Sequence, residues 1–510
     1  MTGFRLTTLL TVATSALVLA ACGSAEVASP GEGDFGGGTP TTPTVPTLPA
    51  GTPAADCPTG LANVGLVANN TLRACQLPAT ITGALTLSVR AGTIYTFSGR
   101  TEVGTDRGVE PGSPIPGSVQ GILTIDPGVK IFASGGSDYL IVNRGSQIFA
   151  EGTATNPIIF TSRQSVEGQN NDASQGQWGG VILVGRAPQA NCVLSATPGA
   201  TTCTGQVEGT SAFYGGNTPA DNSGRFRYVQ INFSGFAIST GNELQGLTLG
   251  AVGSGTTIDH IQVHNSADDG IEIFGGNVNL SHIVLTGADD DGLDTDTGWR
   301  GGAQFGIVTE RTLHVKTSDG RGAGFEFSSA PAATPLASRY VSQAKIANWT
   351  LVTRSTTLDI HTTAHFDTGA DATIINSVFS NAAPSASGCL DIADADTATV
   401  QPTFNAVFMS CSVPYRPNNA ARSTATFAQA PSGGNTAAGT STLTAPTGAA
   451  LTGQALTFIN GANENAVTPV SASSVYSFFV DTPYIGAVRN AADTWYLGWT
   501  CGLSSTSNCR

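Results

Sequence analysis

The chain has 510 residues, of which 36 are acidic and 22 basic, giving a formal net charge of −14 at pH 7. Only three of the basic residues are lysines, so the clustered cations that neutralise phosphates are missing and nucleic-acid binding is not expected. With 63 glycines and only 11% charged residues, the composition disfavours long amphipathic helices and favours strands broken by turns.

Residues 1–21 are predicted to be a signal peptide. Arg5 supplies the positive charge of such a segment, and residues 6–19 form its apolar stretch. This stretch is too short to remain in a bilayer as a spanning helix. Small residues then precede Cys22.

The end of this segment, Leu19-Ala20-Ala21-Cys22, resembles the lipobox of bacterial lipoproteins. The resemblance implies cleavage before Cys22 and attachment of palmitate-type acyl chains to its sulfur and its new amino end. Several acyl chains together give lasting membrane anchorage. No aspartate follows the cysteine, which in that family favours transfer to the outer membrane, with the folded part facing the periplasm or the cell surface. An ordinary signal peptide without a lipid is the alternative.

Residues 22–56 are expected to form a tether, because Gly, Thr and Pro dominate and few apolar residues are present for packing. Nine cysteines less Cys22 leave eight, an even number that suits disulfides in an oxidising compartment. Close pairing along the chain predicts local disulfides, although spacing alone leaves other connectivities open. The expected pairs are Cys57 with Cys75, Cys192 with Cys203, Cys389 with Cys411, and Cys501 with Cys509.

Internal repetition marks the body of the chain. The pattern of residues 123–135 recurs in residues 140–152 at an offset of 17, and that of residues 260–272 recurs in residues 282–294 at an offset of 22. Short apolar-alternating strands between Gly, Asn or Asp turns, repeated about every 20 residues, are typical of the stacked coils of a parallel β-helix. The predicted fold is therefore all-β: a right-handed parallel β-helix with inserted loops and a C-terminal cap.

This fold divides the rest of the chain. The predicted parts are residues 57–117 as an N-terminal cap with the first strands, 118–413 as the β-helix, 414–455 as a low-complexity lobe, and 456–510 as a C-terminal cap. A cap is expected because an open end of the solenoid would expose a strand edge. Loops leaving the cylinder are expected at residues 164–177, 187–222, 298–323 and 328–342.

Five segments of the chain are similar to segments of a known family: residues 121–128 (GILTIDPG), 150–162 (AEGTATNPIIFTS), 177–186 (QWGGVILVGR), 265–272 (NSADDGIE) and 495–499 (WYLGW). They resemble bacterial right-handed β-helix surface lipoproteins of the pectate-lyase-like superfamily, over roughly residues 118–500. The resemblance implies the fold and an envelope location. Because the superfamily contains polysaccharide lyases, hydrolases, epimerases and adhesins, it does not fix the chemistry.

Two acidic coils are the one concentrated chemical feature. Ile271 and Ile273 should point inward, so Glu272 between them faces outward, and Asp294 stacks over it one coil later. Carboxylates about 5 Å apart repel, so their pKa values rise or a cation sits between them. Oxygen ligands without His or Cys suit a hard ion such as Ca²⁺. The predicted calcium ligands are Asp268, Asp269, Glu272, Asp290, Asp291, Asp294 and Glu326.

Two other interpretations of these acids stay open. They could form a solvated face, partly paired with Arg300 and Arg321. Alternatively, some are catalytic, since one carboxyl can protonate a leaving oxygen while another activates water. The Gly-His-Gly and Arg-Ile-Lys segments that β-helix polygalacturonases also use are absent, so catalysis is not favoured. The catalytic candidates are Asp268, Asp269, Asp290 and Asp291.

Other polar and aromatic residues near these coils have two interpretations each. Trp299 and Arg300 are candidate ligand-binding residues, with Trp299 either a sugar-stacking platform or a loop anchor. His260 and His282 occupy one coil position, which Asn348 and Asn376 occupy in other apparent coils. A ladder of stacked polar turn residues is favoured there over a transition-metal site.

The expected function is capture of an extracellular ligand, such as a glycan, by a lipid-anchored surface protein. Ca²⁺ is the one expected cofactor, and an outer-membrane receptor or transporter is a candidate partner. A polysaccharide lyase or glycoside hydrolase, and a structural or adhesive protein without a site, are the alternatives.

Overall fold

The computed structural model describes residues 51–193, 196–239, 241–310, 322, 324–329, 335–353, 362–381, 388–429, 434–446, 456–503 and 509. The predicted signal peptide, Cys22, most of the tether and Arg321 lie outside these residues. Within them strands predominate, and no helix is both long and apolar enough to cross a membrane.

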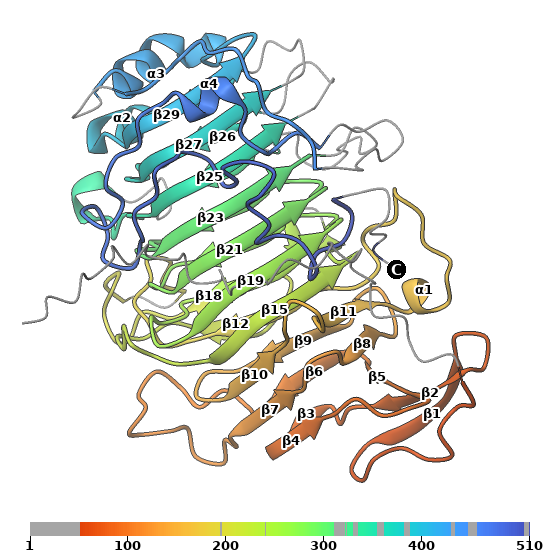
Figure 1. Cartoon of the computed structure of the whole chain (residues 1–510). Coiled ribbons are helices and arrows are strands. Elements are labelled where there is room, and N and C mark those ends of the chain that lie inside the picture. The colour runs from red at the N-terminus through yellow and green to blue at the C-terminus, as the bar shows by residue number, and fades with distance from the viewer. Residues whose placement is uncertain are drawn as a thin grey trace, which may run out of the picture. The chain divides into compact units, whose positions relative to one another are not determined.

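Most strands stack in parallel in two sheets (Figure 1). The 15-stranded sheet, here sheet A, contains β1 (Ala62–Val67), β2 (Leu72–Gln76), β4 (Gly83–Leu87), β5 (Thr93–Phe97), β7 (Gly121–Ile125), β8 (Lys130–Ala133), β10 (Gln147–Glu151), β11 (Ile158–Ser162), β15 (Gly224–Asn232), β19 (Thr257–His264), β21 (Asn279–Thr286), β23 (Gly302–Thr309), β25 (Lys345–Thr353), β27 (Thr373–Asn381) and β29 (Thr403–Cys411). The ten-stranded sheet, here sheet B, contains β3 (Thr80–Ile81), β6 (Arg100–Val103), β9 (Tyr139–Val142), β12 (Val181–Val184), β18 (Leu247–Gly250), β20 (Ile271–Phe274), β22 (Leu293–Asp296), β24 (Phe325–Phe327), β26 (Ala364–Phe366) and β28 (Leu390–Ile392). Each coil passes through both sheets, which is the architecture of a parallel β-helix.

The connections carry short hairpins and helices. They are β13 (Gly205–Gln206) with β14 (Phe213–Tyr214), β16 (Phe236–Ser239) with β17 (Asn242–Leu244), α1 (Arg163–Val166), η1 (Leu336–Ser338), α2 (Ala395–Val400), η2 (Pro417–Asn419), α3 (Ala420–Phe427) and α4 (Ala462–Asn465). Helix α3 packs on β28 and β29, and its Phe427 ring lies 5.5 Å from the Phe404 ring. The edge of β29 is paired as well, since the N–H of Met409 donates to the carbonyl of Thr436 at 2.8 Å. The end of the solenoid is thus covered, as an exposed strand edge requires.

The long strands of sheet A bend at one residue with a positive φ. Strand side chains alternate between two faces, so one left-handed residue turns the second half of the strand in a new direction and gives the coil a third side. In β15 the two halves have different partners, since β10 pairs with residues 224–227 and β11 with residues 229–231. The bend residues are Tyr228, His260, His282, Phe305, Asn348, Asn376 and Ala406. His260, His282, Asn348 and Asn376, which were predicted to share one coil position, therefore all lie at this bend.

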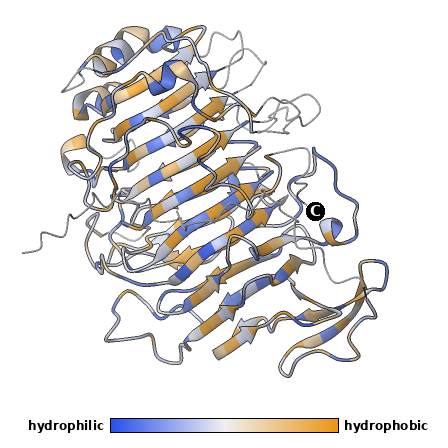
Figure 2. Cartoon of the chain, in the orientation of Figure 1, coloured by the Kyte–Doolittle hydropathy of each residue, from blue (hydrophilic) through white to orange (hydrophobic). Residues whose placement is uncertain are grey.

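Apolar side chains stacked coil over coil fill the interior. Ile271 lies beside Leu293, and Leu293 beside Phe325, and all three are fully buried. Figure 2 shows the pattern behind this packing, with orange and blue residues succeeding one another along many strands. Trp349 on β25 lies opposite Gly306 on β23, so a large residue meets a small one across the coils.

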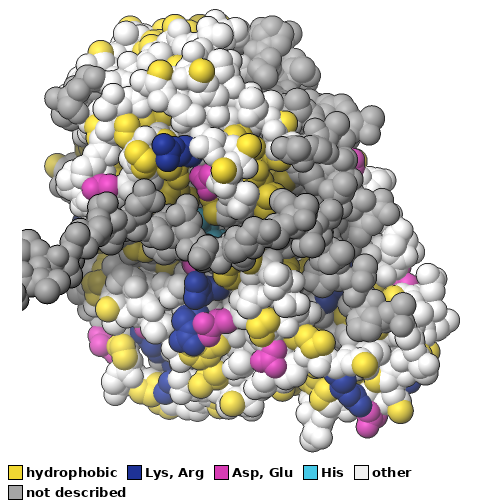
Figure 3. Space-filling model, viewed as in Figure 1, with side chains coloured by type: hydrophobic (Ala, Val, Ile, Leu, Met, Phe, Trp, Pro, Cys, Tyr) yellow, Lys and Arg dark blue, Asp and Glu magenta, His cyan; other side chains and the backbone are white. Residues whose placement is uncertain are grey.

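The C-terminal segment, residues 456–503, covers part of the outer face of sheet A and crosses its strands in Figure 1. Amide side chains of the sheet both donate to and accept from its backbone at 2.6–2.9 Å. These pairs are Gln262 with Cys501, Gln304 with Val480, and Asn376 with Val470. Underneath, outward-facing Val284 and Ile307 pack in one cluster with Phe458 and Trp499. Elsewhere on this face, basic side chains lie in small groups, many beside acidic ones (Figure 3).

The parallel β-helix is confirmed, but only one of the two repeats corresponds to a coil. Glu272 pairs with Asp294, so the offset of 22 leads from one coil to the next. The interpretation of the 17-residue repeat as stacked coils is wrong. Leu123 pairs with Ile148 within sheet A, whereas Leu140 lies in sheet B. The 17-residue match relates two sides of the solenoid, because strands on each side share the same apolar alternation.

Two expected boundaries also change. Residues 302–309, expected within a loop, form β23, whose glycines lie against large rings of neighbouring segments. Strands β2 to β6 already pair in parallel with later coils, so the solenoid begins within residues 57–117. All four predicted disulfides are present.

Replacing Gly306 with alanine should destabilise the fold. A Cβ at this position would lie 2.0–2.2 Å from atoms of the Trp349 ring, and overpacking of this kind costs about 1–3 kcal/mol. Gly112→Ala is the matched control, because nothing lies within 4 Å of its Cβ and the substitution does not strain the chain. Denaturant unfolding should show a lower midpoint for Gly306→Ala only, and equal midpoints would contradict this packing.

Candidate functional site

A column of polar side chains runs along the outer face of sheet B. Glu272 on β20 lies beside Asp294 on β22, and Asp294 lies beside Glu326 on β24. The column continues through His365 on β26 to Asp391 on β28. The residues on either side of each member point into the core, so strand alternation places these five side chains together. We call them the polar column.

The two Asp-Asp-Gly turns lie beside this column, one over the other. The backbone N–H of Asp291 donates to Oδ1 of Asp269 at 2.8 Å, across the 22-residue coil. The N–H of Gly270 donates to the carbonyl of Asp291, also at 2.8 Å. The stacking expected for these turns is therefore present.

Five of the seven predicted calcium ligands form two overlapping groups. Asp269, Glu272 and Asp294, here the acidic triad, bring one carboxylate oxygen each to within 4.8 Å of the others. Asp268, Asp269 and Asp290 do the same. Because both groups contain Asp269 and combine residues of two neighbouring coils, they form one acidic cluster between the coils.

The other two predicted ligands, Glu326 and Asp291, lie outside these two groups. Glu326 groups with His365 and Asp367. Asp291 is buried, and this burial, followed by the nearby charge of Glu326, raises its pKa well above the usual range. The structure therefore places five of the seven acids in the two overlapping groups and Glu326 in a third group with His365 and Asp367. Asp291 belongs to the turn stacked over Asp269.

The acidic triad contains buried oxygens without partners. Oε2 of Glu272 and Oδ1 of Asp294 are buried and make no hydrogen bond. The Glu272 residue is only 6% exposed. A buried carboxylate oxygen is costly unless a proton or a cation satisfies it.

The hairpin β13–β14 and the chain around it cover this part of the column. Nε2 of Gln245 donates to Glu208 and, at 3.3 Å, to Oδ2 of Asp268. Tyr214 is buried, and its ring stacks on Phe274 with 5.8 Å between centroids. Beside the cover lies an open pocket of about 350 Å³, lined by Gln206, Val207, Glu208, Gly209, Thr210, Ser211 and Asn242.

Burial and mutual repulsion raise the pKa values of these acids. Burial is the main cause for Glu272, and the nearby charge of Glu208 adds to it. Burial followed by the charge of Asp296 raises the pKa of Asp294 well above its usual range. Burial is also the main cause that raises the pKa of both Asp296 and Glu208 to about 7. Near neutral pH the site therefore favours uptake of protons or of a positive ion.

The other end of the column is centred on His365. Its Nδ1 lies 3.1 Å from Oδ2 of Asp391, and its Nε2 lies 3.9 Å from Oδ2 of Asp367. Burial on its own lowers the pKa of His365, but the interactions with Asp367 and Asp391 outweigh it and raise the pKa to about 9. Asp391 also accepts from Arg416 at 3.1 Å and Asn419 at 2.7 Å.

Sequence reasoning missed His365 and Asp391 because loops of unequal length separate their coils from the regular 22-residue pair. A local signal was nevertheless present. His365 lies between Ala364 and Phe366, and Asp391 lies between two apolar residues, as Glu272 does. No comparable signal marks Glu208, which reaches the column from an inserted hairpin.

The prediction of Trp299 as a sugar platform is wrong. The side chain is fully buried in the solenoid core, and its Nε1 donates to the carbonyl of Val278 at 3.1 Å. Arg300 lies against Tyr340, with its guanidinium 3.5 Å from the ring centroid, and its Nε donates to the carbonyl of Val341. Among the described residues, Arg300 makes no ion pair with the acidic triad.

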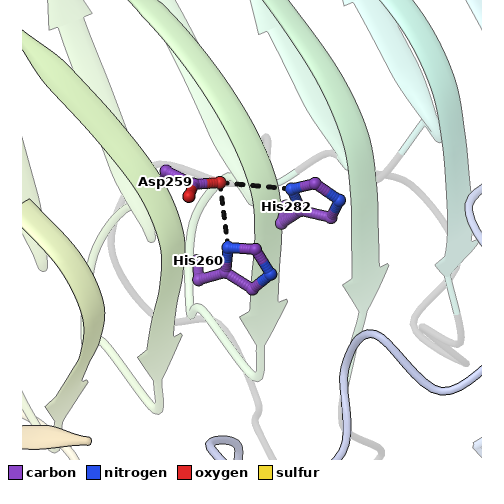
Figure 4. A group of neighbouring side chains, drawn as sticks. All are labelled: Asp259, His260 and His282. Atoms are coloured by element: carbon purple, nitrogen blue, oxygen red, sulfur yellow. Dashed lines mark hydrogen bonds and ion pairs between the residues drawn. The ribbon is translucent and has the colours of Figure 1, made fainter. Parts of the chain in front are cut away.

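The two ladder histidines lie on sheet A and form a separate group. Figure 4 shows Nδ1 of His260 and Nδ1 of His282 facing the same oxygen of Asp259, at 2.9 and 3.1 Å. The rings stack with 4.2 Å between centroids, and Trp495 packs edge-on against both. Burial opposes ionisation of Asp259, but its contacts with the two histidines hold its pKa well below the usual range. This arrangement fits the predicted ladder and helps to bind the C-terminal segment.

The fold and the polar column define a parallel β-helix with an acidic outer face on sheet B. A family model described as a pectate-lyase like beta helix domain matches residues 117–457, which is more than half of the chain. The chain therefore belongs to this family. No curated protein and no solved structure matched the chain. Membership in this family shows the architecture of the chain but not its chemistry, which depends on the residues of the site.

The raised pKa of Asp296 predicts a pH-dependent loss of stability in the metal-free protein. Its pKa rises from 3.8 to about 7 on folding, so its contribution is fully present below pH 3.8 and is lost as the pH rises through about 7. Asp296→Asn removes this contribution. With a chelator present, the wild type should lose stability relative to Asp296→Asn across this interval. A constant difference in the free energy of unfolding would contradict the raised pKa.

Proposed function

We propose that this protein is a lipid-anchored surface β-helix that binds Ca²⁺ at the acidic triad and uses the bound ion to capture a glycan. The observation that carries the proposal is the pair of buried, unpartnered oxygens of Glu272 and Asp294, within a group whose oxygens converge to within 4.8 Å. A divalent cation at this point would satisfy both oxygens and offset the repulsion.

The donor set favours calcium over a softer metal. The acidic triad and the adjoining group of Asp268, Asp269 and Asp290 offer carboxylate oxygens only. Ca²⁺ takes six to eight oxygen ligands at about 2.3–2.6 Å in flexible geometry. Two stacked turns and a strand pair supply acids from several directions, and water or ligand hydroxyls would complete the coordination.

The pocket beside the triad supports a polar ligand. Glu208 lines that pocket and also lies close enough to Glu272 to raise its pKa. Threonine, serine and two amide side chains line the same pocket, and such groups hydrogen-bond sugar hydroxyls. A bound cation with unfilled positions next to this pocket would let a glycan contact the ion and the protein together.

The anchor and the outer-membrane location rest on the sequence around Cys22. If they are correct, metabolic labelling with a palmitate analogue should mark the wild type, which should sediment with membranes. Cys22→Ala should be unlabelled, and it should retain an uncleaved or unlipidated N-terminus. Labelling of Cys22→Ala equal to that of the wild type would exclude this anchor.

Calorimetric titration tests the calcium site. The metal-free wild type should bind Ca²⁺, and the double variant Glu272→Gln/Asp294→Asn should lose at least tenfold in affinity, because two anionic ligands are removed without a change in shape. Binding should also stabilise the fold by about 2.7 kcal/mol at a free concentration 100 times Kd.

Glu151→Gln is the matched control for this titration, since Glu151 lies on sheet A in a partly exposed pair with Arg225. It should bind Ca²⁺ as the wild type does. Absence of binding heat and of thermal stabilisation in the wild type would end the calcium proposal, and so would undiminished binding in the double variant.

A further inference from the structure

A second group of potential metal ligands lies on the polar column, beyond the acidic triad. Glu326 on β24, His365 on β26 and Asp367 just after β26 bring one ligand atom each to within 4.8 Å of the others. His365 is only 4% exposed, and its Nε2 is buried without a hydrogen bond. The 3.9 Å from this atom to Oδ2 of Asp367 is too long for a hydrogen bond.

The opposite side of the imidazole ring is held in place. Its Nδ1 pairs with Asp391 at 3.1 Å, and the Asp391 side chain is 1% exposed. Arg416 and Asn419 each donate to Asp391, so this carboxylate has little freedom to move. A carboxylate on one ring nitrogen fixes the orientation of a metal-binding histidine and leaves the other nitrogen for the metal.

We infer that Glu326, His365 and Asp367 form a site for a divalent first-row transition metal such as Zn²⁺, with Asp391 as the outer partner that orients His365. One imidazole and two carboxylates suit such an ion better than Ca²⁺, which prefers oxygen alone. Three protein ligands leave at least one coordination position for water or for a group of the captured ligand.

The ligand separations are compatible with a modest closure around an ion. Zn²⁺ bonds of about 2.0–2.2 Å place neighbouring ligand atoms about 3.4 Å apart. Ser328 and Thr368 donate to Oδ1 of Asp367 and leave Oδ2 directed toward His365. Rotation of the Glu326 and Asp367 side chains could therefore bring the donors together without movement of the strands.

The histidine pair on sheet A is the competing location for such a metal. There both Nδ1 atoms already face one oxygen of Asp259, and His282 Nδ1 also pairs with Ser281 at 2.8 Å. Trp495 and other rings pack against the two imidazoles. Neither His260 Nδ1 nor His365 Nε2 makes a hydrogen bond of regular geometry. His260 Nδ1 is nevertheless in ion-pair contact with Asp259 at 2.9 Å, whereas His365 Nε2 lies 3.9 Å from Oδ2 of Asp367, which leaves more room for an ion.

Titration of the whole protein with Zn²⁺, and with Co²⁺ as an absorbing probe, tests the site. The wild type should bind Zn²⁺ and give a Co²⁺ spectrum with a nitrogen ligand. His365→Gln should weaken Zn²⁺ binding at least 100-fold and abolish that spectrum. Asp391→Asn should weaken binding about 10- to 100-fold, and Asp367→Asn should weaken it as well.

Two controls separate this site from the others. His282→Gln should bind Zn²⁺ like the wild type, and Glu272→Gln should keep Zn²⁺ while losing Ca²⁺ affinity. Retained Ca²⁺ binding in His365→Gln or Asp367→Asn would show that the variant is folded. The inference is overturned if the wild type binds no Zn²⁺, if His365→Gln and Asp367→Asn both bind it unchanged, or if only His282→Gln loses it.

Discussion

In-register stacking of parallel strands is the constraint on which the rest of this structure depends. Neighbouring strands lie about 4.8 Å apart, so a residue pattern repeated once per coil becomes a continuous row of side chains. Inward rows such as Ile271, Leu293 and Phe325 form the core. Outward rows place Glu272, Asp294 and Glu326 side by side although their negative charges repel one another.

The same stacking gives sheets A and B different roles. On sheet A, the C-terminal segment covers the outward amides and apolar residues. The side chains of Gln262 and Gln304 each donate a hydrogen bond to its backbone and accept one from it. On sheet B, the outward row from β20 to β24 is acidic, and buried oxygens are left without hydrogen bonds at Glu272 and Asp294. Core packing holds these acids together despite the repulsion between their charges.

The fold could be predicted from the sequence because apolar alternation and regular turns recur along the chain. The 22-residue repeat correctly placed Glu272 beside Asp294 because no insertion separates their coils. The 17-residue repeat did not correspond to a coil, because strands on different sides of the solenoid share the same apolar alternation. Strand β23 was not predicted because its glycines pack against Trp349 and Tyr476, which come from distant parts of the chain. The local alternation around His365 marks it as an outward residue, but its place in the column depends on the lengths of the loops between coils. Glu208 reaches the column from an inserted hairpin, which no local pattern encodes.

The most direct test of the account is a crystal structure of the protein soaked with Ca²⁺, with anomalous differences used to locate the ion. A peak is expected between the carboxylates of Asp269, Glu272 and Asp294, with Asp269 stacked beside Asp291. A fully occupied crystal with no peak at the triad, or with these three acids on different faces of the solenoid, would contradict it.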